Sequence, residues 1–206
     1  MNLTYVQNSL HAALRLAVRD PQAWGKFDLT ADGFFRSFVA ILLVAPINIL
    51  YDLFDFRLAQ ARALSDGKIP SAIEYGFSEV LFSTAALAIG WFVFPLVLLF
   101  LLRFLDLSHR YATMVIAHNW GSVVIQIFNV PAIILFSVGL ISHQIALDLL
   151  FVTFGLALYY RFYIAQTALD IGWGLAVGIS MLELLMSIFF VLAVSDTRFL
   201  WLPSAS

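Results

Sequence analysis

Three ionisable side chains stand inside long apolar runs of this sequence, namely His118, Arg161 and Glu183, and Asn119 adds an amide beside the histidine. An ionisable group in hydrocarbon is costly, so such a residue is a candidate for a ligand site or an ion path. A proton relay would need more than one buried carboxylate. Glu183 is the only carboxylate deep in an apolar run.

Helical spacing predicts that these side chains can meet. At about 1.5 Å per residue, Arg161 lies about 13 Å before a turn at Asp170, and Glu183 lies about 19 Å beyond it. An arginine on a neighbouring antiparallel helix can bridge the difference of about 6 Å. His118 lies roughly 10 Å past Tyr111 on the same side of the membrane. We therefore predict one polar cluster that joins three helices, made of His118, Asn119, Arg161 and Glu183.

Three interpretations of this cluster remain open. Arg161 and Glu183 can neutralise each other and hold two helices together, which is a structural role. The same groups can form a ligand site or an ion path. Catalysis is the third interpretation, and no additional acid, base or nucleophile near them supports it.

The familiar signatures of enzymes and metal sites are absent. The sequence contains no His-Glu-x-x-His, no Gly-x-Ser-x-Gly and no phosphate-binding loop. It has no cysteine, which excludes disulfides and thiolate ligands. Its 11 Lys and Arg residues form no basic patch suited to nucleic acid. We expect no catalytic residue, no metal, no cofactor and no nucleic-acid partner, and hence a protein that is not an enzyme.

The composition indicates where these residues sit. Hydrophobic residues make up 62% of the chain and charged residues 12%, against roughly 45–50% and 25% in soluble domains. The apolar residues form long unbroken runs, whereas a β-barrel requires alternation. Because backbone amides in hydrocarbon must be satisfied within each segment, the runs predict helices. The fold class expected is all-α, a polytopic membrane helix bundle.

Five transmembrane spans follow from the apolar runs. The third run, 111–141, measures about 46 Å as a helix, more than a hydrocarbon core of about 30 Å. Its limits are ambiguous, and we expect a break or kink near Asn129-Val130-Pro131. Pro46 and Pro95 are further kink sites. The predicted spans are 33–52, 80–102, 111–141, 144–168 and 172–194, in a transmembrane domain 33–194 between an N-terminal segment 1–32 and a short tail 195–206.

The N-terminal residues 3–19 have the pattern of an amphipathic helix that ends at Asp20-Pro21. We expect this helix to lie in the membrane interface. Packing against the protein's own core is the alternative. The apolar side chains that share one face are Leu3, Val6, Leu10, Ala13, Leu14, Ala17 and Val18.

Residues 53–79 are expected to form the only sizeable extramembrane loop. Within it, Leu53–Leu64 suits a short amphipathic helix, and Asp66–Pro70 suits a turn. Ser71 and Glu74 have the spacing of a capping box that would start the next helix.

Basic residues near the span ends predict orientation. One side of a five-span topology collects seven of them, Arg15, Arg19, Lys26, Arg36, Arg103, Arg110 and Arg161. The other side collects four, Arg57, Arg62, Lys68 and Arg198. The excess places the N-terminus in the cytoplasm.

Gly174 and Gly178 form a small-xxx-small pattern in the fifth span. Such a face lets a second helix approach closely. The partner can be a helix of the same chain or a second copy.

The layout resembles the bacterial members of the Yip-type membrane protein family. The residues that carry this resemblance are Arg110–Ala117 leading into the third span and Ala165–Leu169 leading through Gly172 into the fifth. The Asp-Leu-Tyr-Gly-Pro motif of the eukaryotic members is missing. The segment Trp24–Phe38 is similar to proteobacterial inner-membrane proteins. The resemblance implies a multi-pass protein of the bacterial inner membrane without enzymatic activity.

Two functions are expected from these features. The first is a membrane scaffold or adaptor whose partners are the lipid bilayer and other membrane proteins or itself. The alternative is a component of a small-solute or ion transport system that uses the buried polar cluster. A scaffold's cluster should be dry and fully paired, whereas a transporter's should line a water-accessible cavity.

Overall fold

A computed structural model describes residues 3–65, 67 and 76–201, and within them every regular element is a helix. This confirms the all-α fold class. The elements are α1 (Leu3–Ala17), η1 (Pro21–Lys26), α2 (Ala31–Ser37), η2 (Phe38–Ala40), α3 (Ile41–Ser65), α4 (Phe77–Phe104), η3 (Ser108–Arg110), α5 (Tyr111–Ser137), α6 (His143–Leu169) and α7 (Trp173–Trp201).

Five segments are long and apolar enough to cross a membrane, so the chain is a multi-pass membrane protein. Lipid-facing positions account for much of their apolar surface, since large hydrophobic side chains such as Phe100 and Phe151 stay exposed in the isolated chain. The segments are Ala31–Gln60, Phe77–Phe104, Ser108–Ser137, His143–Leu169 and Trp173–Val194.

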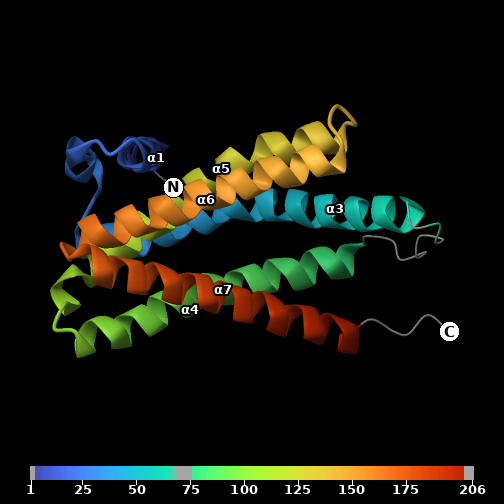
Figure 1. Ribbon diagram of the computed structural model, residues 1–206. Helices are drawn as coiled ribbons and strands as arrows, with labels where there is room; N and C mark the ends of the chain where they lie inside the picture. The colour runs from blue at the N-terminus through green and yellow to red at the C-terminus, as the bar shows by residue number, and fades with distance from the viewer. Residues whose placement is uncertain (1–2, 66, 68–75, 202–206) are drawn as a thin grey trace.

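The helix α5 packs against more of the other elements than any other helix does, and it lies beside α6 at the upper edge of the bundle in Figure 1. It packs against α6 on one side and against α3 on the other, and α4 and α7 contact each other below them. Of the five segments, the one that contains α5 is the most buried. Its side chains Met114, Ile116 and Trp120 are fully buried in the core.

The amphipathic helix α1 packs against the bundle itself, which is the alternative that the sequence left open. Its buried residues include Val6, Ala12 and Leu16, all part of the main hydrophobic core. The Tyr160 hydroxyl of α6 donates a hydrogen bond of 2.7 Å to the Ala13 carbonyl. Leu3 and other apolar side chains of the predicted stripe remain exposed.

The first span is longer than its sequence pattern suggests. The predicted loop helix Leu53–Leu64 is the continuation of α3, which runs unbroken to Ser65. Phe54 and Leu58 are buried against Ile133 of α5 and Ala146 of α6, so this part of α3 is anchored in a second core. The predicted turn and capping box at residues 66–74 lie outside the described residues, apart from Gly67.

The third span does not break near Pro131, because α5 continues through this residue to Ser137. The kink that was expected there as the alternative stays a prediction. A turn then ends the helix: Gly139 has a positive φ of 75°, and the Leu140 amide donates to the Leu135 carbonyl at 2.9 Å. This is the geometry in which glycine terminates a helix. Arg57 also donates to the last carbonyl of α5, at Ser137, over 2.9 Å.

The hairpin of α6 and α7 begins and reverses at specific residues. The Ser142 hydroxyl accepts from the Ile145 amide and caps the start of α6. Asp170 adopts a left-handed φ of 56° directly after the helix, where its carboxylate lies 3.2 Å from Arg110. The helix α7 then continues to Trp201, beyond the expected end of the fifth span near Val194.

Candidate functional site

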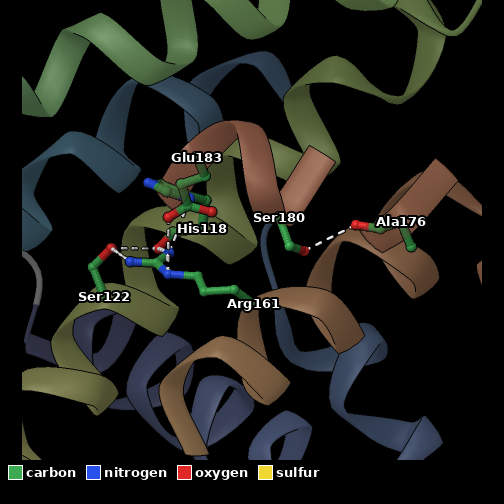
Figure 2. Close-up of polar contacts among 6 residues, drawn as sticks. All are labelled: His118, Ser122, Arg161, Ala176, Ser180 and Glu183. Carbon is green, nitrogen blue, oxygen red and sulfur yellow. Dashed lines mark hydrogen bonds and ion pairs between the residues drawn. The ribbon is translucent and has the colours of Figure 1, made fainter. Parts of the chain in front are cut away.

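A polar cluster joins α5, α6 and α7 near their middle (Figure 2). The Arg161 Nε atom lies 3.0 Å from Oε1 of Glu183. Its Nη1 atom lies 2.9 Å from Nδ1 of His118, and its Nη2 atom donates to the Ser122 hydroxyl over 2.8 Å. Three helices of the bundle therefore meet at one guanidinium group.

The cluster is tightly held on all sides. The Nη1 atom of Arg161 also donates to the His118 carbonyl over 3.2 Å, and the Ser122 hydroxyl donates to that same carbonyl over 2.8 Å. The ring of His118 stacks on Phe94 of α4 with centroids 4.6 Å apart. The side chains of His118, Arg161 and Glu183 are only 11%, 15% and 12% exposed. Such a paired and oriented arrangement lowers the cost of keeping charge in a low-dielectric region.

Asn119 lies apart from this cluster. One residue along a helix is a rotation of about 100°, which turns Asn119 away from His118. Its side-chain amide donates to the Ser37 hydroxyl over 2.9 Å, where both residues are buried. Asn119 therefore fastens the α2 segment to α5.

Gly174 and Gly178 lie on the outer surface of α7. A Cβ atom added at either glycine would meet nothing within 4 Å. The opposite face of the same helix carries the buried residues Ala176, Ile179 and Ser180. Close helix packing inside the chain occurs instead at Gly121 of α5, where an added Cβ would lie 2.6 Å from Cδ1 of Ile164.

A cavity of about 640 Å³ opens beside the polar cluster and is lined by α3, α4, α5 and α7, with Arg161 contributed by α6. It extends from the middle of the bundle toward the end where α3 finishes and α4 begins, since Asp55 and Phe82 also line it. Its wall mixes aromatic and aliphatic side chains with polar ones. The polar lining residues are Asn48, Tyr51, Asp52, Asp55, Ser83, His118, Ser122, Gln126, Asn129, Arg161, Glu183 and Ser187.

Much of this polar lining escaped the sequence analysis. On α5, Ser122, Gln126 and Asn129 follow His118 at intervals of four, four and three residues, which is the spacing of a single helix face. This spacing could have been recognised in the sequence as one polar face of a helix. The contribution of Asp52 and Asp55 carried no such signal, because Asp52 stood at the end of the first predicted span and Asp55 in the predicted extramembrane loop.

The described residues contain no group of three metal-ligating side chains that could hold an ion. The arrangement can instead bind and orient a polar solute or exchange a proton. Outside the spans, hydrogen bonds hold two carboxyl groups in their charged form. The Gln22 amide and Arg15 side chain lower the pKa of Asp20, and the Thr30 hydroxyl and amide lower the pKa of Asp28.

Comparison with known proteins gives no match to a family model, to a curated protein or to a solved structure. The resemblance to Yip-type proteins therefore stays a prediction.

Proposed function

We propose that this protein is a component of a small-solute or ion transport system, with its binding site in the cavity beside Arg161 and Glu183. The observation that supports this most is that the paired charges lie on a cavity wall. A purely structural ion pair would be expected in a dry helix interface. A polar, roomy cavity is instead a place where water can enter.

The dimensions and lining of the cavity support binding of a small molecule. Ligand pockets commonly measure about 300–1,000 Å³ and combine apolar walls with a few polar groups. Here Phe94 and Trp91 supply apolar wall, and five helices contribute polar side chains. The lining carries three carboxyl groups and one guanidinium group, a combination that suits a cation or a neutral polar solute over an anion.

The slight contact of α4 with α5 and with α7 supports a pathway rather than a fixed pocket. The contact of α4 with α5 is slight compared with that of α6 with α5. Pro95 interrupts the hydrogen-bond ladder of α4 directly after Phe94, which lies on the cavity wall. A kinked helix that lines a cavity can rock against its neighbours, as in the bundles of alternating-access transporters.

The orientation inferred from basic residues gives this proposal a direction. We place the protein in the bacterial inner membrane with its N-terminus in the cytoplasm, because Arg15, Arg19 and Lys26 belong to the more basic side. The end of the cavity near Asp55 then faces the opposite compartment.

Blocking the cavity tests the proposal. Ser187 is an exposed residue on the cavity wall of α7, whereas Leu185 is exposed on the same helix outside the lining. We expect proteoliposomes with the natural chain to swell in iso-osmotic glycerol, urea or potassium chloride faster than protein-free vesicles. Ser187→Trp should reduce the rate to that of protein-free vesicles, and Leu185→Trp should not. Equal rates for all samples, with every solute, would contradict a transport role.

The glycine face of α7 favours a second candidate, the scaffold or adaptor. Gly174 and Gly178 are exposed and leave room for another helix to approach the backbone. A scaffold role predicts that Gly178→Leu abolishes recovery of a crosslinked complex from native membranes. Gly155→Leu is the matched control, since Gly155 of α6 is also exposed and open. Unchanged crosslinking in Gly178→Leu would count against this candidate.

A further inference from the structure

The hydrogen bonds of the cluster assign a protonation state to His118. An arginine side chain has only donors and keeps its charge in proteins. Because Nη1 of Arg161 lies 2.9 Å from Nδ1 of His118, this ring nitrogen must be the acceptor. The ring is therefore neutral and carries its hydrogen on Nε2.

The same ring nitrogen lies near a carboxylate. Nδ1 of His118 is 3.6 Å from Oε1 of Glu183, which is already 3.0 Å from Nε of Arg161. Figure 2 shows the imidazole, the guanidinium and the carboxylate converging on this point. A proton placed on Nδ1 would turn an acceptor into a donor and would face a guanidinium N–H group.

We propose that His118 is a proton-binding site of the cavity and that its protonation makes Glu183 accept a hydrogen bond from His118 as well as from Arg161. The inference rests on the proposed function, since water in the cavity delivers the proton. The new N–H bond forms on Nδ1, and the imidazole becomes an imidazolium ion. The contact between Nη1 of Arg161 and Nδ1 breaks, and Oε1 of Glu183 accepts the new hydrogen bond.

The surroundings of His118 favour this exchange over a larger rearrangement. Arg161 stays attached to α5 through the Ser122 hydroxyl, and Phe94 holds the plane of the imidazole ring. A shift of less than 1 Å brings the 3.6 Å separation between Nδ1 and Oε1 to hydrogen-bonding distance. The exchange frees a guanidinium N–H group and adds one positive charge to the cavity wall.

The other titratable groups near His118 lie on α3, α6 and α7. The helix α6 contributes Arg161, and α7 contributes Glu183. The helix α3 contributes Tyr51, Asp52 and Asp55 farther along the cavity. The described lining residues of α4 are not titratable. Tyr5 of α1 contacts Trp120, which lies two residues after His118 and therefore on another face of α5. Arg161 and Glu183 are therefore the immediate charged neighbours of His118.

This exchange gives the transport system a proton-coupled step. With neutral His118, Arg161 is occupied by Glu183, His118 and Ser122. With charged His118, one donor of Arg161 becomes available to a solute in the cavity. Proton binding and solute binding are then linked through the same guanidinium group.

Nitrogen-15 NMR of the histidine rings in lipid bilayers tests the proposal. The chain has four histidines, and His11, His109 and His143 are exposed. Changing these three to Gln leaves His118 as the sole labelled ring without altering the cluster. We expect the neutral Nε2–H tautomer near pH 8 and a reversible change to imidazolium between pH 8 and the lowest pH at which the protein stays folded.

A second variant checks the cause of the tautomer. Arg161→Gln in the same background should release Nδ1 and produce both neutral tautomers near pH 8. A neutral Nδ1–H tautomer in the parent, or a ring that stays neutral over the whole pH range, would overturn the proposal. Swelling that responds to Ser187→Trp while His118 fails to charge would reject only the proton site. Absence of any solute flux would reject the proposed function instead.

Discussion

At the scale of single residues, Arg161 holds the centre of the bundle together through its three nitrogen atoms. Its contacts with Glu183, His118 and Ser122 connect α6 to both neighbouring helices. Charged groups in such a position are held by mutual pairing, since the free energy of desolvating each charge is large. Removing one member leaves the other without compensation.

The first prediction concerns the stability of this pair. Glu183→Gln should lower the free energy of unfolding by about 3 kcal/mol, because it leaves a buried guanidinium unpaired. Thermal denaturation in a mild detergent measures the effect. The double variant Arg161→Gln/Glu183→Gln should recover more than half of the loss. A double variant whose loss equals the sum of the two single losses would show that the residues are not energetically coupled.

Residue spacing correctly predicted those contacts that depend only on how deep each residue lies along its helix. Arithmetic on residue spacing brought Arg161, Glu183 and His118 to similar depths, and the structure places them within hydrogen-bonding or ion-pair distance. The same arithmetic included Asn119, which the rotation of the helix directs toward Ser37. Depth is a property of residue number, whereas direction depends on how each helix is rotated in the bundle.

At the scale of the elements, the closest approach of two helices lies between α5 and α6. Gly121 provides the space, since Ile164 and Tyr160 occupy the position where its side chain would be. Small residues permit this closeness in membranes. The pattern of Gly174 and Gly178 was easier to recognise in the sequence than Gly121, but these two glycines lie on the outer surface of α7.

The second prediction separates these two kinds of glycine. Gly121→Ala should destabilise the protein by about 1–3 kcal/mol, the usual cost of overpacking. Gly178→Ala should be neutral or stabilising by up to about 1 kcal/mol, because alanine favours helix and meets no neighbour. Thermal unfolding of the two variants provides the comparison. Equal effects would contradict the assignment of the tight interface to α5 and α6.

The third prediction concerns the N-terminal segment, where Asp20 accepts from the Gln22 amide and pairs with Arg15. Because its pKa is lowered in the folded state, its stabilising contribution is present above the unfolded pKa of about 3.9. It is lost as the pH falls through the lower folded pKa. We expect the fluorescence of Trp24, in η1, to stay constant from neutral pH to about pH 5 and to change below about pH 4.

Asp20→Asn is the control for this prediction. It removes the titrating group, and the acid-dependent change in Trp24 fluorescence should become smaller. Asp28→Asn tests the neighbouring turn in the same way, since Thr30 lowers the pKa of Asp28. A change centred near neutral pH in the natural chain would contradict a carboxyl group as its source.

The elements themselves were largely predictable from apolar runs. The fourth span, expected at 144–168, is α6 from His143 to Leu169. Prediction was weakest where a helix continues beyond the end of an apolar run. Asp55, Arg57 and Arg62 suggested a loop, yet α3 continues through them because Phe54 and Leu58 are buried against α5 and α6. Tertiary packing of this kind leaves little trace in local sequence.

At the scale of the whole molecule, the cavity depends on the placement of α4 and α7. The helix α4 packs against α3 and the helix α7 packs against α6, whereas α4 makes only slight contact with α5 and with α7 (Figure 1). The resulting space could not be predicted from sequence, since no single helix contains it. Its polar lining gives the charged cluster access to a solute, and this access is the basis of the proposed function.

The most direct test of this account is whether water reaches the cavity. The natural chain has no cysteine, so single thiols can be introduced without background. Ser187→Cys lies on the cavity wall, and Ser180→Cys lies two turns earlier on α7 in a buried position. A membrane-impermeant cationic methanethiosulfonate, which reacts with thiolates in water, should label Cys at 187 in intact vesicles and leave Cys at 180 unmodified. Protection of both thiols would mean a dry interface and would contradict the account.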